Sequence, residues 1–168
     1  LEFRRGSSDL SPVAVNWTES NSTDTGSFSN SGQTSTNTSG VATVTFTTNI
    51  HRNVATKISA TTDGSTETGE SSTITTTYGA IHHWVVTPST TSPVAGAPVT
   101  VTAQATDANG NNVDTASPVA VNWTESNSTD TGSFSNSGQT STNTSGVATV
   151  TFTTNIHRNV AKIGRAHV

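Results

Sequence analysis

Residues 11–55 have the sequence SPVAVNWTESNSTDTGSFSNSGQTSTNTSGVATVTFTTNIHRNVA, and the same 45 residues recur without a change at 117–161. The offset between the two copies is 106 residues, from Ser11 to Ser117. Repetition at a fixed period is typical of domains arranged in tandem, and this period is close to the length of one small β-sandwich domain. We therefore predict one domain per period, with both copies in this chain truncated.

Both ends of the chain depart from the repeat. After Ala161 the second copy continues with KIGRAHV, residues 162–168, where the first copy has TKISATT. These seven residues, and LEFRRGSSDL at 1–10, resemble translated sequencing-library adapters. We interpret both ends as adapter artefacts and exclude them from the prediction of the fold. A nucleotide record that encodes the ends with unrelated codons would contradict this interpretation.

The charge of the repeat region limits its partners. Between residues 11 and 161 there are three basic and nine acidic residues, a formal net charge of −6. Binding to nucleic acid requires clustered Lys and Arg that neutralise phosphates. We therefore expect no nucleic-acid partner, and no direct membrane insertion in this segment.

The apolar residues alternate with threonine. Thr occurs 36 times in 168 residues, and β-branched residues favour strands. In the segment VATVTFT at 41–47, Ala42, Val44 and Phe46 face one way and the intervening threonines the other. Such alternation predicts a half-buried strand of an antiparallel sheet, here and in the identical segment at 147–153.

Placed in register, the two copies predict seven strands per domain and turns between them. We expect an all-β chain, an immunoglobulin-like β-sandwich with Greek-key connections. Residues 11–79 are expected to form the C-terminal part of one domain (strands C to G), and 80–161 the N-terminal part of the next (strands A to E). The expected strands are A near 82–87, B at 97–106, C at 118–124, D around 132–142, E at 146–154, F near 54–61 and G near 72–78.

Residues 86–111, VTPSTTSPVAGAPVTVTAQATDANGN, resemble the opening of bacterial Ig-like domains of the invasin and intimin type. The later segment TSGVATVTFTT at 144–154 is similar to their E strand, and Trp123 stands where their C strand carries Trp. The resemblance implies a sandwich without a disulfide, as the absence of Cys requires. The expected structural core consists of Trp17, Val44, Phe46, Trp123, Val150 and Phe152.

The resemblance also implies a function, because modules of this kind form tandem stalks. We expect a non-catalytic spacer in an adhesin-like protein that is secreted or lies on the bacterial cell surface. Its partners would be the neighbouring repeats, while a host-cell or glycan ligand would bind other domains. Two alternatives stay open: a glycan- or protein-binding module of a phage virion protein, and an accessory domain of an extracellular enzyme.

A spacing of oxygen-bearing side chains gives one metal candidate. Asp107, Asn109, Asn111 and Asp114 could offer ligands to Ca²⁺. Glycine falls at the fourth position and no Glu closes the loop, so the EF-hand pattern fails. The competing interpretation is a turn at Asn109-Gly110 between strands B and C.

No catalytic motif accompanies this loop. His82 and His83 are adjacent, and adjacent residues of a strand point to opposite faces, so we expect them not to chelate one metal. The sequence has no G-x-S-x-G motif. We predict no enzymatic activity and no cofactor.

Overall fold

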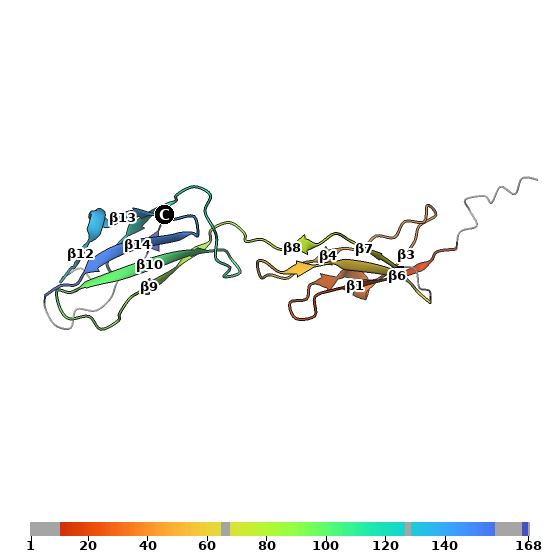
Figure 1. Ribbon diagram of the computed structural model, residues 1–168, viewed down its shortest axis with the longest axis horizontal. Coiled ribbons are helices and arrows are strands. Elements are labelled where there is room, and N and C mark those ends of the chain that lie inside the picture. Colours follow the sequence, from red (N-terminus) through yellow and green to blue (C-terminus); the bar gives the residue numbers. More distant parts are fainter. Residues whose placement is uncertain (1–10, 65–67, 127–128, 157–165, 168) are drawn as a thin grey trace, which may run out of the picture. The chain divides into compact units, whose positions relative to one another are not determined.

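The computed structural model describes residues 11–64, 68–126 and 129–156, together with the backbone of 166–167. These residues form antiparallel β-sheets and two short 3-10 turns, without an α-helix (Figure 1). The all-β class is therefore confirmed. The chain divides into two compact units, Leu1–Thr77 and Tyr78–Val168. Apart from the backbone of 166–167, the proposed adapter ends lie outside the described residues.

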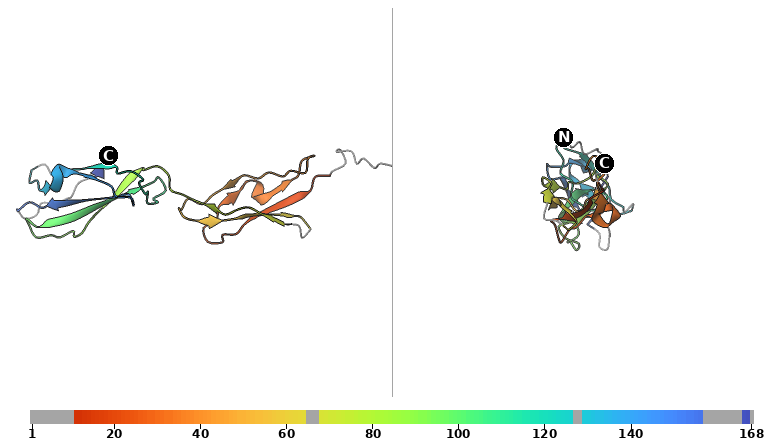
Figure 2. Two further views of the ribbon diagram at one scale, coloured as in Figure 1. Left: turned by 45° about the horizontal axis from the view of Figure 1, so that its top comes forward. Right: turned by 90° about the vertical axis from the view of Figure 1, so that its right-hand side faces the viewer.

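The second unit contains a four-stranded sheet with the order β12-β14-β10-β9 and a three-stranded sheet with the order β13-β11-β15. Figure 2 (left) shows the green β10 and the blue β14 along one side of this unit. The strands are β9 (His83–Pro88), β10 (Pro98–Thr106), β11 (Ala120–Trp123), β12 (Ser133–Phe134), β13 (Gln139–Ser141), β14 (Val147–Thr153) and β15 (Ala166–His167).

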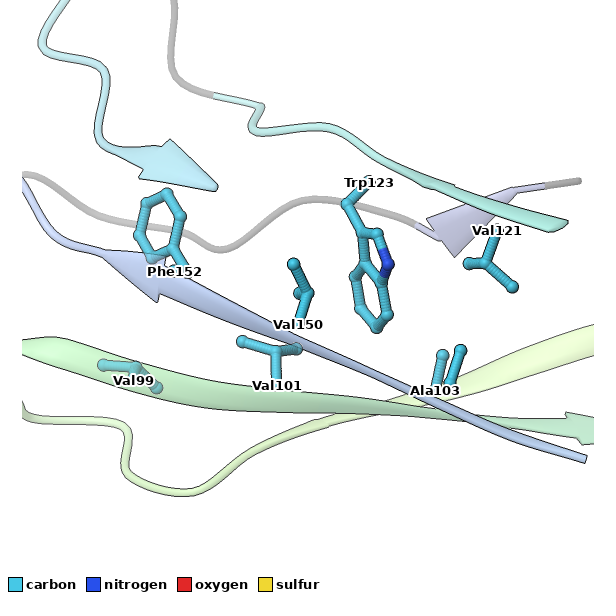
Figure 3. Close-up of a cluster of buried hydrophobic side chains, with 8 residues drawn as sticks. Val99, Val101, Ala103, Val121, Trp123, Val150 and Phe152 are labelled. Carbon is cyan, nitrogen blue, oxygen red and sulfur yellow. The ribbon is translucent and has the colours of Figure 1, made fainter. Parts of the chain in front are cut away.

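The core of the second unit is built by both sheets. Alternate residues of β10 and β14 point to one side, and Trp123 extends from β11 toward them (Figure 3). Trp123 is only 5% exposed, and its Nε1 donates a hydrogen bond to Oγ1 of Thr140 at 2.7 Å. The buried cluster consists of Val99, Val101, Ala103, Val121, Trp123, Ala148, Val150 and Phe152.

The first unit contains sheets with the orders β3-β1-β6-β7, β2-β4 and β5-β8. The pairing of β1 with β3, from Ala14↔Ser35 to Asn16↔Gln33, repeats that of β11 with β13, from Ala120↔Ser141 to Asn122↔Gln139. The strands are β1 (Ala14–Glu19), β2 (Ser27–Phe28), β3 (Gln33–Ser35), β4 (Phe46–Thr47), β5 (Ala55–Thr56), β6 (Ile58–Thr62), β7 (Thr68–Glu70) and β8 (Ile74–Thr75).

One predicted strand of the first unit is largely missing. The segment at 147–153 is a seven-residue strand, whereas the identical segment at 41–47 is a strand only at Phe46–Thr47. The reason is the partner: β14 pairs with β10 from Pro98↔Thr153 to Gln104↔Val147, and the described part of the first unit has no strand equivalent to β10. The prediction of a full strand at 41–47 was wrong, because alternation alone does not supply a hydrogen-bonding partner.

The same difference changes the burial of the expected core residues. Trp123, Val150 and Phe152 are buried in the second unit. Their counterparts Trp17, Val44 and Phe46 are only half-buried. The three residues of the second unit therefore belong to a buried core, whereas their counterparts in the first unit stay partly exposed.

The strand expected around 132–142 is interrupted. β12 and β13 are separated by a 3-10 turn, η2 (Ser135–Gly138), in which Asn136 and Ser137 have φ of 51° and 52°. The identical turn η1 (Ser29–Gly32) separates β2 and β3. Consecutive residues in the left-handed region cannot continue a pleated strand, so the single-strand prediction was wrong in both copies.

Candidate functional site

The loop after β10 is the candidate calcium site of the sequence. It is closed by the backbone, since the amide of Asp107 donates to the carbonyl of Asn111 and the amide of Gly110 to the carbonyl of Asp107, at 2.9 and 3.1 Å. Gly110 has φ of +83°, a conformation that favours glycine. The predicted turn at Asn109-Gly110 is therefore present.

Asp107 is 2% exposed, and its carboxylate lies at the centre of this loop. Oδ1 accepts hydrogen bonds from the backbone amides of Asn109 and Asn111, both at 2.9 Å. Oδ2 accepts from the amide of Gly79 at 2.9 Å and from Nδ2 of Asn111 at 3.0 Å. Hydrogen-bond donors thus surround both oxygens of the buried Asp107 carboxylate.

These donors stabilise the ionised carboxylate. The amide of Gly79 makes the largest contribution and the side chain of Asn111 the next, and together with the loop amides they lower the pKa of Asp107 to about 2. Hydrogen bonds to the charged form lower the pKa of an acid because they are weaker when the group is protonated. Asp107 is therefore an ionised anchor at neutral pH.

The same geometry bears on the calcium candidate. Asn109 contributes its backbone N–H, and Asn111 presents its N–H groups to Asp107. A cation needs oxygen ligands, whereas the Asp107 oxygens face hydrogen-bond donors. Asp114 is half-buried, and the described residues contain no group of three or more His, Cys, Asp or Glu side chains that could hold a metal. The loop is thus arranged as a structural anchor.

The contact with Gly79 has no signal in the sequence. Gly79 lies 28 residues before Asp107, and the nearby amide of His82 donates to the carbonyl of Thr106 at 2.8 Å. Through this hydrogen bond, Asp107 holds the first residues of the second unit against the end of β10. The D-x-N-G pattern predicts the turn, but not this partner.

The side chains of His82 and His83 do not point apart as predicted. Their Nδ1 atoms are 3.4 Å apart, and the ring planes meet at 87°. The expectation of opposite faces was wrong because β9 begins at His83, so the alternation of a strand does not extend to His82. That the pair does not chelate a metal stays a prediction. Both residues are exposed.

Asp107→Asn is expected to lower the melting temperature of the second unit by several degrees at pH 7. Asn places an amide group where two acceptor oxygens are needed. Since the folded-state pKa is below the unfolded value of about 4, the stabilisation is complete above pH 4 and is lost as the pH falls through about 2. The difference between variant and wild type, measured by calorimetry, should shrink over that interval.

The control for this experiment is Asp63→Asn, which removes the same charge from an exposed side chain. Asp63→Asn should leave the melting temperature of the second unit nearly unchanged. A difference between Asp107→Asn and wild type that stays constant from pH 5 to pH 2 would show that the ionised carboxylate is not the anchor.

No protein-family model matches the chain, and no curated protein is significantly similar to it. Among the described residues there is no helix with the length and apolar character needed to cross a membrane.

Proposed function

We propose that the chain belongs to a tandem array of immunoglobulin-like β-sandwich domains of the invasin and intimin type, and that the array is a non-catalytic stalk. The unchanged recurrence of 45 residues at an offset of 106 carries this proposal. Arrays of similar domains change length by copying whole repeats. A protein whose task is to provide length tolerates such copies, because each new domain needs only to fold and join its neighbours.

The architecture of the second unit supports the sandwich. Antiparallel strands from two sheets contribute to one apolar cluster, and Trp123 occupies its middle (Figure 3). An immunoglobulin-like domain packs two antiparallel sheets over a core that contains a Trp of strand C. Under this assignment β9 and β10 are strands A and B, β11 is strand C, and β14 is strand E.

The proposed location is the surface of a bacterium or its surroundings, within an adhesin-like protein. The partners of each domain are its neighbouring repeats, and the ligand of the whole protein binds elsewhere. Strands of seven to ten residues rise about 3.3 Å per residue, so each domain would add about 25–35 Å to the stalk.

Changing the number of repeats tests the spacer role. Arrays of one, two and four complete 106-residue periods are placed between a membrane anchor and a fluorescent tip on a bacterial surface. The height of the tip, measured by super-resolution microscopy, is expected to grow by about 25–35 Å for each added period. A height independent of the number of periods would refute the stalk. So would saturable binding of the isolated chain to glycans, which would favour the binding-module alternative.

A further inference from the structure

The loop that holds Asp107 also carries an Asn-Gly pair. The chain has fifteen asparagines, and Asn109 is the one that a glycine follows. Both Asn109 and Gly110 are exposed. The backbone N–H of Asn109 donates to Asp107, whereas its side-chain amide has no hydrogen-bond partner among the described residues. The Asn109 side chain can therefore turn toward the backbone that follows it.

The backbone nitrogen of Gly110 is the nearest nucleophile to that side chain. Its attack on Cγ of Asn109 closes a succinimide ring within one chain segment, so the reaction needs no encounter with a second molecule. Glycine has no Cβ to crowd the attack, and a Cβ placed on Gly110 would meet no atom of another segment within 4 Å. The nitrogen is therefore sterically open.

The folded loop restrains this nitrogen through hydrogen bonds. The amide of Gly110 donates to the carbonyl of Asp107 at 3.1 Å, and the nitrogen attacks only after it has lost its proton. Oδ1 of Asp107 fixes the turn, because it accepts from the amides of Asn109 and Asn111, both at 2.9 Å. A hydrogen-bonded amide gives up its proton when the segment opens. The Asp107 carboxylate thus limits how often base reaches the Gly110 amide.

We propose that Asn109 is a site of spontaneous deamidation and that the hydrogen bonds of Asp107 set its rate. The Gly110 nitrogen loses its proton to base and forms a bond with Cγ of Asn109. The Cγ–Nδ2 bond breaks, and Nδ2 takes up a proton and leaves as ammonia. Water then adds to one of the two ring carbonyls and opens the ring, which leaves aspartate or isoaspartate at position 109. The net change consumes one water and releases one ammonia, without oxidation or reduction.

The reaction alters the loop in which it occurs. Both products place a new carboxylate beside the buried charge of Asp107, and like charges held close together disfavour ionisation of the pair. Isoaspartate also adds one carbon to the backbone of the turn, which displaces the amide of Asn111 from Oδ1. We therefore expect deamidation to weaken the hold of Asp107 on Gly79. This inference goes beyond the spacer role, because it concerns the ageing of one domain and is independent of what the array carries.

The test follows the masses of proteolytic fragments of the whole chain after incubation in mildly alkaline buffer. The fragment with Asn109 is expected to show the replacement of NH₂ by OH before any other asparagine reacts. A peptide of residues 104–114 gives the rate without a folded loop and should react about tenfold or more faster than the chain. Asp107→Ala should accelerate the reaction about tenfold in the chain, because it removes hydrogen bonds to a charged group, and should leave the peptide rate nearly unchanged.

Two further variants and one measurement separate opening of the loop from unfolding. Asp63→Ala removes an exposed carboxylate from the first unit and should leave the rate at Asn109 unchanged. Gly79→Pro removes the N–H that donates to Oδ2 of Asp107 and should accelerate the reaction by a smaller factor. The amides of β10, which is paired with β14, exchange hydrogen when the second unit unfolds. In the wild-type chain the Gly110 amide is expected to exchange before them.

Four results would overturn the proposal. They are equal rates in the chain and the peptide, rates unchanged by both Asp107→Ala and Gly79→Pro, exchange of the Gly110 amide together with those of β10, and earlier reaction of another asparagine. The exchange measurement uses the wild-type chain, so the proposal can fail even if both substitutions unfold the second unit. None of these results bears on the measurement of stalk height, so the two proposals can fail separately.

Discussion

Trp123→Ala is expected to lower the free energy of unfolding of the second unit by about 3–5 kcal/mol, the range found for removal of a large buried aromatic side chain. Trp123 is 5% exposed and belongs to the buried cluster of both sheets. Its removal leaves a cavity between β10, β14 and β11 and takes the donor from Thr140. Denaturation in urea, followed by far-UV circular dichroism, measures the loss.

The chain supplies its own control for this substitution. Trp17 has the same sequence neighbours and the same hydrogen bond to a Thr hydroxyl, but it is only half-buried. Because less apolar surface is removed from water around it, Trp17→Ala should cost less than half as much in the first unit. Equal losses would show that β9 and β10 contribute little to the core of the second unit. They would count against the pairing of β10 with β14 as the cause of the deeper burial of Trp123.

Gly146→Ala is expected to destabilise the second unit by about 3 kcal/mol or more, since it combines backbone strain with overlap against fixed backbone. Gly146 has φ of +71°, and a Cβ there would overlap the carbonyl oxygen of Val113. The residue directly precedes β14, so relief of the overlap would displace the first pairs of that strand from β10. Chemical denaturation measures the effect.

Gly40 is the matched site in the first unit. Its φ is +76°, but nothing lies within 4 Å of a Cβ placed there. Gly40→Ala should therefore cost only the left-handed strain of about 1–2 kcal/mol. The difference between the two substitutions isolates the contact with Val113, and it would vanish if the strand after Gly146 could shift freely.

Two long strands of the second unit follow closely from sequence, whereas the strand expected around 132–142 is interrupted by η2. The strand expected at 97–106 is β10 at Pro98–Thr106, and that expected at 146–154 is β14 at Val147–Thr153. Alternation succeeds there because both faces of the pattern meet the environment that they require, an apolar core and solvent. It fails at 41–47 because strand pairing is a property of two segments, and a periodic pattern describes only one.

In the Asp107 loop, too, the local sequence predicts only part of the structure. Asp107 and Asn109-Gly110 predict a turn, since Asp bonds its own backbone two residues on and Gly accepts a positive φ. The bond from Gly79 depends on where the chain enters the second unit, and no local pattern encodes that position. This distant donor makes the largest single contribution to the lowered pKa of Asp107, so the full lowering could not be predicted from the loop alone.

The order of β9, β10 and β14 along the chain has a consequence for biosynthesis. Translation proceeds from the N-terminus, and domains generally fold as units in that order. The hairpin at 83–106 leaves the ribosome before residues 147–153, so β14 emerges onto a partner that already exists. In the proposed array of repeats, each nascent segment of this sequence would meet the hairpin of its own repeat before the next hairpin has been made. The direction of synthesis would thus protect identical neighbours from exchanging strands.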